Sequence, residues 1–270
     1  MQFTTVLSEQ ALLAKKVLES NTGYSFNKKI IHNSFFSKNQ NLRLEDVKLR
    51  LIVIDSTYST QMGRRLFGFS DLAREILKIS ENSDLILKDK LTNYLQDFTK
   101  NNEIDKILTM PFGLKKNGVK AGVATSLISK YFYFVSNFQF PIYDSLIKNS
   151  LPIINKKYKV LNNLHFGNRN SRSLYFETIL AFNKKSGICN IDRLDNLCWL
   201  FGKIVKGSFS LVIKKSEYLD LIDRVDTFKK DSKEIDKNIH CYLSANTPPK
   251  DLFSKELIEF IGFVYNTVYE

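Results

Sequence analysis

The chain has 270 residues, of which 43% are hydrophobic and 25% are charged, and its formal net charge is +12. This length and apolar content allow a sizeable buried core and exclude an intrinsically disordered chain. The 11 glycines and 5 prolines, together with apolar spacings of three and four, predict an all-α fold.

In chain order, the apolar spacing predicts helices at residues 8–19, 45–62, 69–79, 85–99 and 123–135, a short helix between Asp144 and Pro152, a helix from Asp192 to Val205, and a closing helix around 252–264. Ser8, Asp144 and Asp192 are the expected N-caps. Pro152 is expected to end its helix, because a proline ring disrupts the helical hydrogen bonds. Residues 24–44 show no clear period, so no helix is predicted there.

The positive charge is concentrated in the middle of the chain. Residues 111–210 hold 15 lysines and arginines but only 4 acids, whereas residues 211–270 hold more acids than bases. A basic surface of this kind favours a polyanionic partner, and double-stranded DNA is the partner we expect. The alternative is a basic face that is merely solvated.

The first residues lack the basic and apolar regions of a secretory leader, and no window approaches about 18 uninterrupted apolar residues. We therefore expect a cytoplasmic, monomeric protein that has no membrane contact and no obligatory protein partner. The three cysteines lack Cys-x-x-Cys spacing, and the three histidines stand far apart in the sequence. This pattern argues against a zinc site, an iron–sulfur cluster or a disulfide framework, so no metal and no cofactor are expected.

Two segments are candidate contacts to DNA. The predicted helix that begins near Glu45 turns polar in its second half, and short hydroxyl and amide groups suit a helix end that probes a duplex. Its polar end consists of Thr57, Tyr58, Ser59, Thr60 and Gln61. A glycine-rich turn further along carries Lys115, Lys116 and Lys120, which are candidate phosphate contacts. The alternatives are an exposed, frayed helix end and solvated loop lysines.

Asp144 is an isolated carboxylate that follows Pro141 in the most basic part of the chain. Cleavage of a glycosidic bond builds positive charge on the sugar, and a desolvated carboxylate stabilises that charge or orients the attacking water. The extruded base also needs aromatic walls. The candidates for these walls are Tyr131, Phe140, Tyr143 and Trp199. The alternatives are a plain helix cap for Asp144 and core packing for the aromatic residues.

These segments, in this order, resemble the helix-hairpin-helix (HhH-GPD) DNA glycosylase superfamily, as in a diverged bacterial member similar to 8-oxoguanine DNA glycosylase fold proteins. The resemblance is carried by the polar-ended helix Leu51–Thr60, the hairpin Gly122-Val123-Ala124, the acid Asp144, and the apolar helix ending in Gly202-Lys203. It covers about residues 45–205. It implies two helical lobes flanking a DNA-binding cleft, with residues 45–150 as one lobe and residues 1–44 plus 151–270 as the other.

The resemblance also implies roles for individual residues. Asp144 lies 22 positions after Gly122, the distance at which the family carries its essential acid. Ser126 stands where members with lyase activity have a lysine, so a monofunctional glycosylase of base-excision DNA repair is implied, with Gly122 and Ser126 near the DNA. Lys130 lies one helical turn further along the same face. It is interpreted as a phosphate contact, a Schiff-base nucleophile or a surface residue.

Three other classes of function stay open: a non-catalytic DNA-binding module of the same fold, a nuclease, and a basic helical scaffold for RNA or protein. The base that a glycosylase would release is also open. Oxidised guanine, alkylated purines and the modified bases of a phage genome are all compatible with the sequence.

Overall fold

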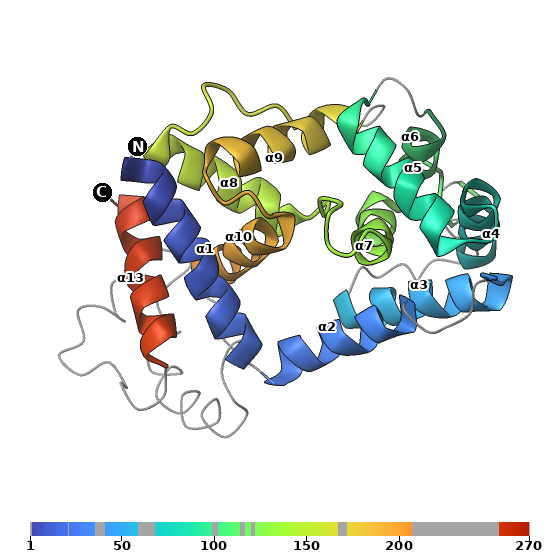
Figure 1. The fold of residues 1–270 in the computed structure, drawn as a ribbon, viewed down its shortest axis with the longest axis horizontal. Helices are drawn as coiled ribbons and strands as arrows, with labels where there is room; N and C mark the ends of the chain where they lie inside the picture. Colours follow the sequence, from blue (N-terminus) through green and yellow to red (C-terminus); the bar gives the residue numbers. More distant parts are fainter. Residues whose placement is uncertain are drawn as a thin grey trace. The chain divides into compact units, whose positions relative to one another are not determined.

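The computed structural model describes residues 2–20, 22–35, 41–58, 68–98, 102–113, 117–119, 122–166, 172–206 and 254–269. Within these ranges it contains eleven helices and no β-strand, which confirms the predicted all-α class (Figure 1). None of the described helices is long and apolar enough to cross a lipid bilayer.

The chain forms two compact units. Unit 1 consists of Met1–Phe26, Ser145–Asn163 and Phe182–Glu270, and unit 2 consists of Asn27–Asp144 and Leu164–Ala181. The chain therefore leaves unit 2 directly after Asp144 and returns to it at Leu164.

Unit 1 contains four helices that contact one another: α1 (Gln2–Ser20), α8 (Ser145–Tyr158), α10 (Ile191–Val205) and α13 (Lys255–Tyr269). Figure 1 shows α1 (dark blue) beside α13 (red). The prediction that Ser8 caps the first helix is wrong, because Ser8 lies inside α1. The fully buried Leu7 and Ala11 lie on either side of it in sequence, and their burial favours a helix that starts before Ser8.

Two further predicted boundaries in unit 1 are wrong. Pro152 lies inside α8 and does not end it. Ile154 and Asn155 beyond it are buried, so packing keeps the chain helical despite the missing amide. The N-cap of α10 is Asn190, whose side-chain oxygen accepts a hydrogen bond from the Arg193 amide, whereas Asp192 lies in the first turn.

Unit 2 contains α3 (Leu44–Tyr58), α4 (Phe69–Ser80), α5 (Asp84–Gln96), α6 (Asn102–Leu108) and α7 (Thr125–Val135). Helices α3, α5 and α6 all contact α7. Every residue from Leu127 to Val135 is buried, so α7 is the core helix of this unit.

Two helices continue from one unit's residues into the other's: α2 (Thr22–Phe35) and α9 (Ser173–Lys185). Neither was predicted, and nor was α6. In α2 the buried Ile31 and Phe35 are mixed with the exposed Phe26 and Ile30, and this mixture hides the helical period in the sequence.

Arg50 forms a buried ion pair and hydrogen bonds that connect helices of unit 2. Arg50 of α3 donates hydrogen bonds from Nη1 to both carboxylate oxygens of Asp84, each at 2.9 Å, and from Nε to the Ser34 carbonyl at 3.0 Å. Its guanidinium also lies 4.4 Å from the centre of the Phe35 ring. These contacts join α2, α3 and the start of α5.

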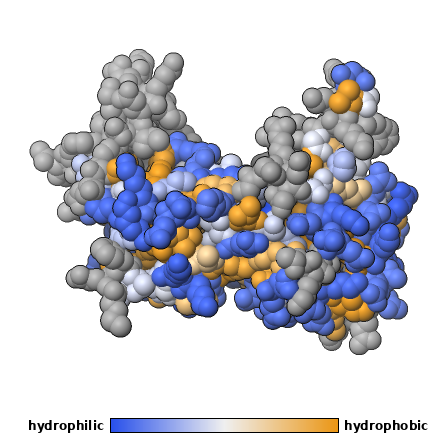
Figure 2. Space-filling model, turned by 90° about the horizontal axis from the view of Figure 1, so that it is seen from above, coloured by the Kyte–Doolittle hydropathy of each residue, from blue (hydrophilic) through white to orange (hydrophobic). Residues whose placement is uncertain are grey.

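On the face shown in Figure 2, hydrophilic side chains predominate among the described residues and apolar side chains are scattered between them. The large apolar residues that are exposed include Leu49 and Ile52 on α3 and Leu85 on α5. Individual exposed apolar residues are normal on a globular surface and indicate no site by themselves.

Candidate active site

Helix α7 carries a lysine in its buried stretch. The Lys130 side chain is only 2% exposed, and its neighbours in α7 are mostly aromatic and aliphatic. Its Nζ donates a hydrogen bond of 2.7 Å to Oγ of Ser126, which lies one helical turn earlier. A buried ammonium group is costly unless it is paired, so its partners define the site.

The charged partner of Lys130 is Asp144. Lys130 Nζ lies 3.1 Å from Asp144 Oδ2, and the Asp144 side chain is 22% exposed. The carboxylate therefore keeps a partly exposed face while its cationic partner is enclosed. Of the three interpretations of Lys130, the surface residue is wrong because of this burial.

An aromatic ring also lies near Lys130. Its Nζ lies 5.5 Å from the centre of the Tyr58 ring, within the range of a cation–π contact. Tyr58 is the last residue of α3 and is half-buried. One of the five residues predicted to probe a duplex thus lies near the candidate catalytic lysine. The neighbouring Thr57 is also half-buried at the end of α3.

Hydrogen bonds to the backbone place Asp144 beside α7. Oγ of Ser129 accepts a hydrogen bond of 2.9 Å from the Tyr143 amide, and Oγ of Ser136 accepts one of 2.8 Å from the Phe140 amide. Ser129 is buried inside α7, and Ser136 is buried at the C-cap of this helix. The segment from Phe140 to Asp144 is therefore folded back along α7, which explains how residues 14 positions apart form an ion pair.

Two of the predicted base-pocket residues have the contacts of core residues. The Tyr131 and Phe140 side chains are fully buried. The Tyr131 hydroxyl accepts a 3.5 Å hydrogen bond from Arg50, and burial raises the pKa of this phenol above its ordinary value. Phe140 packs edge-on against Phe132 and Phe176. The structure gives both rings a packing role.

The other two predicted pocket residues are half-buried. Tyr143 directly precedes Asp144 in unit 2, and its ring lies 4.8 Å from that of Tyr175. Trp199 belongs to unit 1, where its ring lies 5.0 Å from Tyr24 and 5.2 Å from Nζ of Lys203.

Backbone contacts join Pro111 and Phe112 to Gly122 and Val123, just before α7. Pro111 and Val123 form an isolated antiparallel β-bridge, and the Phe112 amide donates a 2.8 Å hydrogen bond to the Gly122 carbonyl. Gly122 is exposed and has a φ of 145°, a conformation that favours glycine. The predicted DNA contacts Ser59, Thr60, Gln61, Lys115, Lys116 and Lys120 lie outside the described residues.

Sequence reasoning gave no role to Ser129, Arg172 or Tyr175, which hold the segment before Asp144. A serine at position 129 inside an apolar helix was a usable signal, because a buried hydroxyl needs a hydrogen-bond partner. Arg172 and Tyr175 left no such signal, since their contacts join segments about thirty residues apart in sequence.

Among the described residues, no three His, Cys, Asp or Glu side chains are grouped as they would be to hold a metal ion. Comparisons of the chain with protein-family models, with curated proteins and with solved structures found no match.

Proposed function

We propose that this protein is a DNA glycosylase that hydrolyses the N-glycosidic bond of a damaged or modified base, with Asp144 as its essential acid. The single observation that carries the proposal is the ion pair of Asp144 with Lys130, in which the carboxylate is partly exposed and the ammonium is buried. The excess of basic residues between 111 and 210 supports a polyanionic substrate.

The proposed chemistry needs one carboxylate near the sugar. As the bond to the base breaks, its electron pair leaves with the base and positive charge develops on the sugar ring. The Asp144 carboxylate stabilises this cation, and water adds to the anomeric carbon as the released base takes up a proton. The Ser126 hydroxyl and the Tyr58 ring hold the Lys130 ammonium group in place. The carboxylate beside it therefore does not have to move during the reaction.

A second candidate reaction is favoured by the position of the Lys130 amine. Nζ donates its hydrogen bond to Asp144 Oδ2, so the carboxylate is placed to accept a proton from the lysine. The neutral amine would then attack the anomeric carbon, and the base would leave with the electron pair of the broken bond and take up the proton held by Asp144. The sugar would stay attached to Nζ. Borohydride reduces the imine that forms on ring opening and so traps the protein on DNA.

The test uses purified protein and a panel of duplexes that each carry one lesion, with EDTA present. The proposal predicts alkali-revealed strand breaks at one or more lesions, with little release by Asp144→Asn and normal release by the matched surface variant Asp71→Asn. Asp71 is exposed and pairs with Arg74 on α4. Trapping by borohydride, abolished in Lys130→Met, would establish the second reaction.

The competing classes give different results in the same assay. A non-catalytic DNA-binding module would bind the duplexes in a salt-sensitive manner and release no base from any of them. A nuclease would cut undamaged DNA only when magnesium replaces EDTA. Either outcome would overturn the glycosylase proposal.

A further inference from the structure

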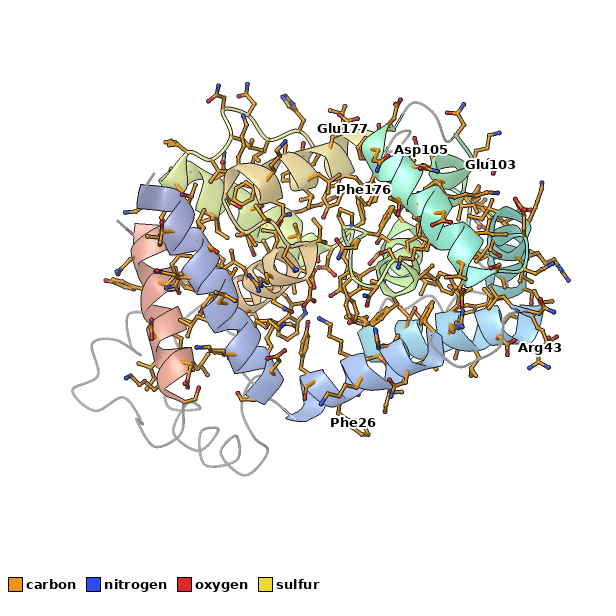
Figure 3. The ribbon with its side chains drawn as sticks, viewed as in Figure 1. Phe26, Arg43, Glu103, Asp105, Phe176 and Glu177 are labelled. Atoms are coloured by element: carbon orange, nitrogen blue, oxygen red, sulfur yellow. The ribbon has the colours of Figure 1, made fainter. Side chains whose placement is uncertain are left out.

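The short segment Ile142–Asp144 is held by side chains from a distant part of the chain. The Tyr175 hydroxyl, on α9, donates a 2.7 Å hydrogen bond to the Ile142 carbonyl. Tyr175 is fully buried, as is its neighbour Phe176, whereas Glu177 is exposed; Figure 3 labels the latter two on α9. The buried side of α9 is therefore the side that reaches this segment.

Arg172 holds the same segment through the ring of Tyr143. Its guanidinium carbon lies 4.8 Å from the centre of the Tyr143 ring, and its Nε donates a 3.3 Å hydrogen bond to Oγ1 of Thr125. The Tyr143 ring also contacts Tyr175 at 4.8 Å with an interplanar angle of 61°. Arg172 is 5% exposed, so this arrangement belongs to the interior of unit 2.

The path of the chain makes these contacts important for Asp144. Asp144 is the last residue of unit 2 before the chain continues into unit 1. Its backbone is therefore continuous with unit 2 on one side only. Arg172 and Tyr175 lie in the returning stretch Leu164–Ala181 and attach the two residues before Asp144 to unit 2.

We propose that Tyr175 and Arg172 are positioning residues that keep the Asp144 carboxylate at its distance from Lys130. This inference rests on the proposed function, because it assigns these residues to the reaction of the same site. A hydrogen bond to the Ile142 carbonyl fixes a peptide plane two residues before the carboxylate. A displacement of the carboxylate by about 1 Å costs roughly a hundredfold in rate when the chemistry depends on geometry.

Tyr175→Phe is the variant that tests the proposal, because it removes one hydroxyl and keeps the ring. The single-turnover rate of base release should fall about tenfold to a hundredfold, while the affinity for the duplex stays within about twofold. The matched control is Tyr94→Phe. Tyr94 is also fully buried in unit 2, and its hydroxyl donates a 2.7 Å hydrogen bond to Asp105, labelled in Figure 3. This control loses a similar hydrogen bond and should keep the wild-type rate.

Two variants test the arginine contact. Arg172→Lys keeps the charge but lacks the planar group that stacks on Tyr143, so its rate should fall as in Tyr175→Phe. The matched control is Arg74→Lys, in an exposed pair with Asp71 on α4, which should keep the wild-type rate. If the Tyr175→Phe and Tyr94→Phe rates are equal, the positioning role is wrong.

A second readout does not depend on activity. The ¹H–¹⁵N signal of the Lys130 Nζ group, identified by its absence in Lys130→Met, reports the contact of this group with Asp144. We expect this signal to shift or to lose protection from solvent exchange in Tyr175→Phe and to stay unchanged in Tyr94→Phe. An unchanged signal in both variants would overturn the positioning role. A response confined to Tyr175→Phe, in a protein that releases no base, would overturn the proposed function and keep the structural coupling.

Discussion

Lys130 Nζ lies 3.1 Å from Asp144 Oδ2, and the lysine is enclosed in the core helix of unit 2 while the carboxylate is partly exposed. An ion pair of this kind is asymmetric, because only one of its members would be left buried and charged if its partner were removed. Removing Asp144 and removing Lys130 should therefore change the free energy of unfolding by different amounts.

The first prediction concerns stability. Asp144→Asn should lower the free energy of unfolding by about 1–3 kcal/mol, because the buried ammonium loses its countercharge. Lys130→Met should keep the free energy of unfolding within about 1 kcal/mol of the wild-type value or raise it, since the new side chain is apolar and similar in length. Urea unfolding of both variants and of the double variant measures these differences. Equal losses in the two single variants would contradict the asymmetry.

The second prediction concerns the buried ion pair of Arg50 with Asp84. Arg50→Lys should cost about 1–3 kcal/mol of unfolding free energy, because a lysine cannot contact Asp84 and the Ser34 carbonyl together. The matched control is Arg74→Lys, in an exposed Arg–Asp pair on α4, where the change should stay within about 0.5 kcal/mol. Similar losses of unfolding free energy in the two variants would show that the buried contacts of Arg50 do not stabilise the fold.

The third prediction compares two glycines inside helices of unit 1. A Cβ on Gly202 would lie 2.9 Å from Ser150 Oγ and 3.0 Å from a methyl carbon of Leu146, so Gly202→Ala should cost about 1–3 kcal/mol. Among the described residues, a Cβ on Gly262 would meet nothing within 4 Å, so Gly262→Ala should stabilise by about 0.5–1 kcal/mol through helix propensity. Thermal unfolding measures both, and shifts of the same sign would refute the close packing of α8 against α10.

The fourth prediction concerns pH. The hydrogen bond from Arg43 holds the pKa of Asp46 below its ordinary value of 3.8. The folded protein therefore binds this proton less readily than the unfolded chain, and the pair stabilises the fold above about pH 3.8. The contribution is lost as the pH falls through the lowered pKa. The stability difference between wild type and Arg43→Gln should thus shrink between about pH 6 and pH 2.5. A difference that is constant across this range would contradict the prediction.

The spacing of apolar residues in the sequence correctly predicted the helices in which this spacing is regular. The expected helices at 69–79 and 85–99 correspond to α4 (Phe69–Ser80) and α5 (Asp84–Gln96). The continuation of α8 beyond Pro152 could not be predicted, because it depends on burial of Ile154 and Asn155 by residues distant in sequence. Local propensity is overridden by tertiary packing at such positions.

The candidate site was predictable only in part. The spacing from Gly122 and the basic surroundings in the sequence indicated Asp144 as a candidate. Lys130 was indicated because it lies one helical turn after Ser126. The burial of Lys130, and the support of Asp144 by Ser129 and Tyr175, depend on the fold. A sequence records which groups are present, but it does not record which of them the tertiary structure brings within hydrogen-bond distance.

The most direct test of the central claim is the single-turnover rate of base release by wild type and Asp144→Asn on a duplex lesion that the wild type processes. We expect a fall of about a hundredfold or more in the variant, with duplex affinity retained and with Asp71→Asn at the wild-type rate. Base release by Asp144→Asn at the wild-type rate would contradict it.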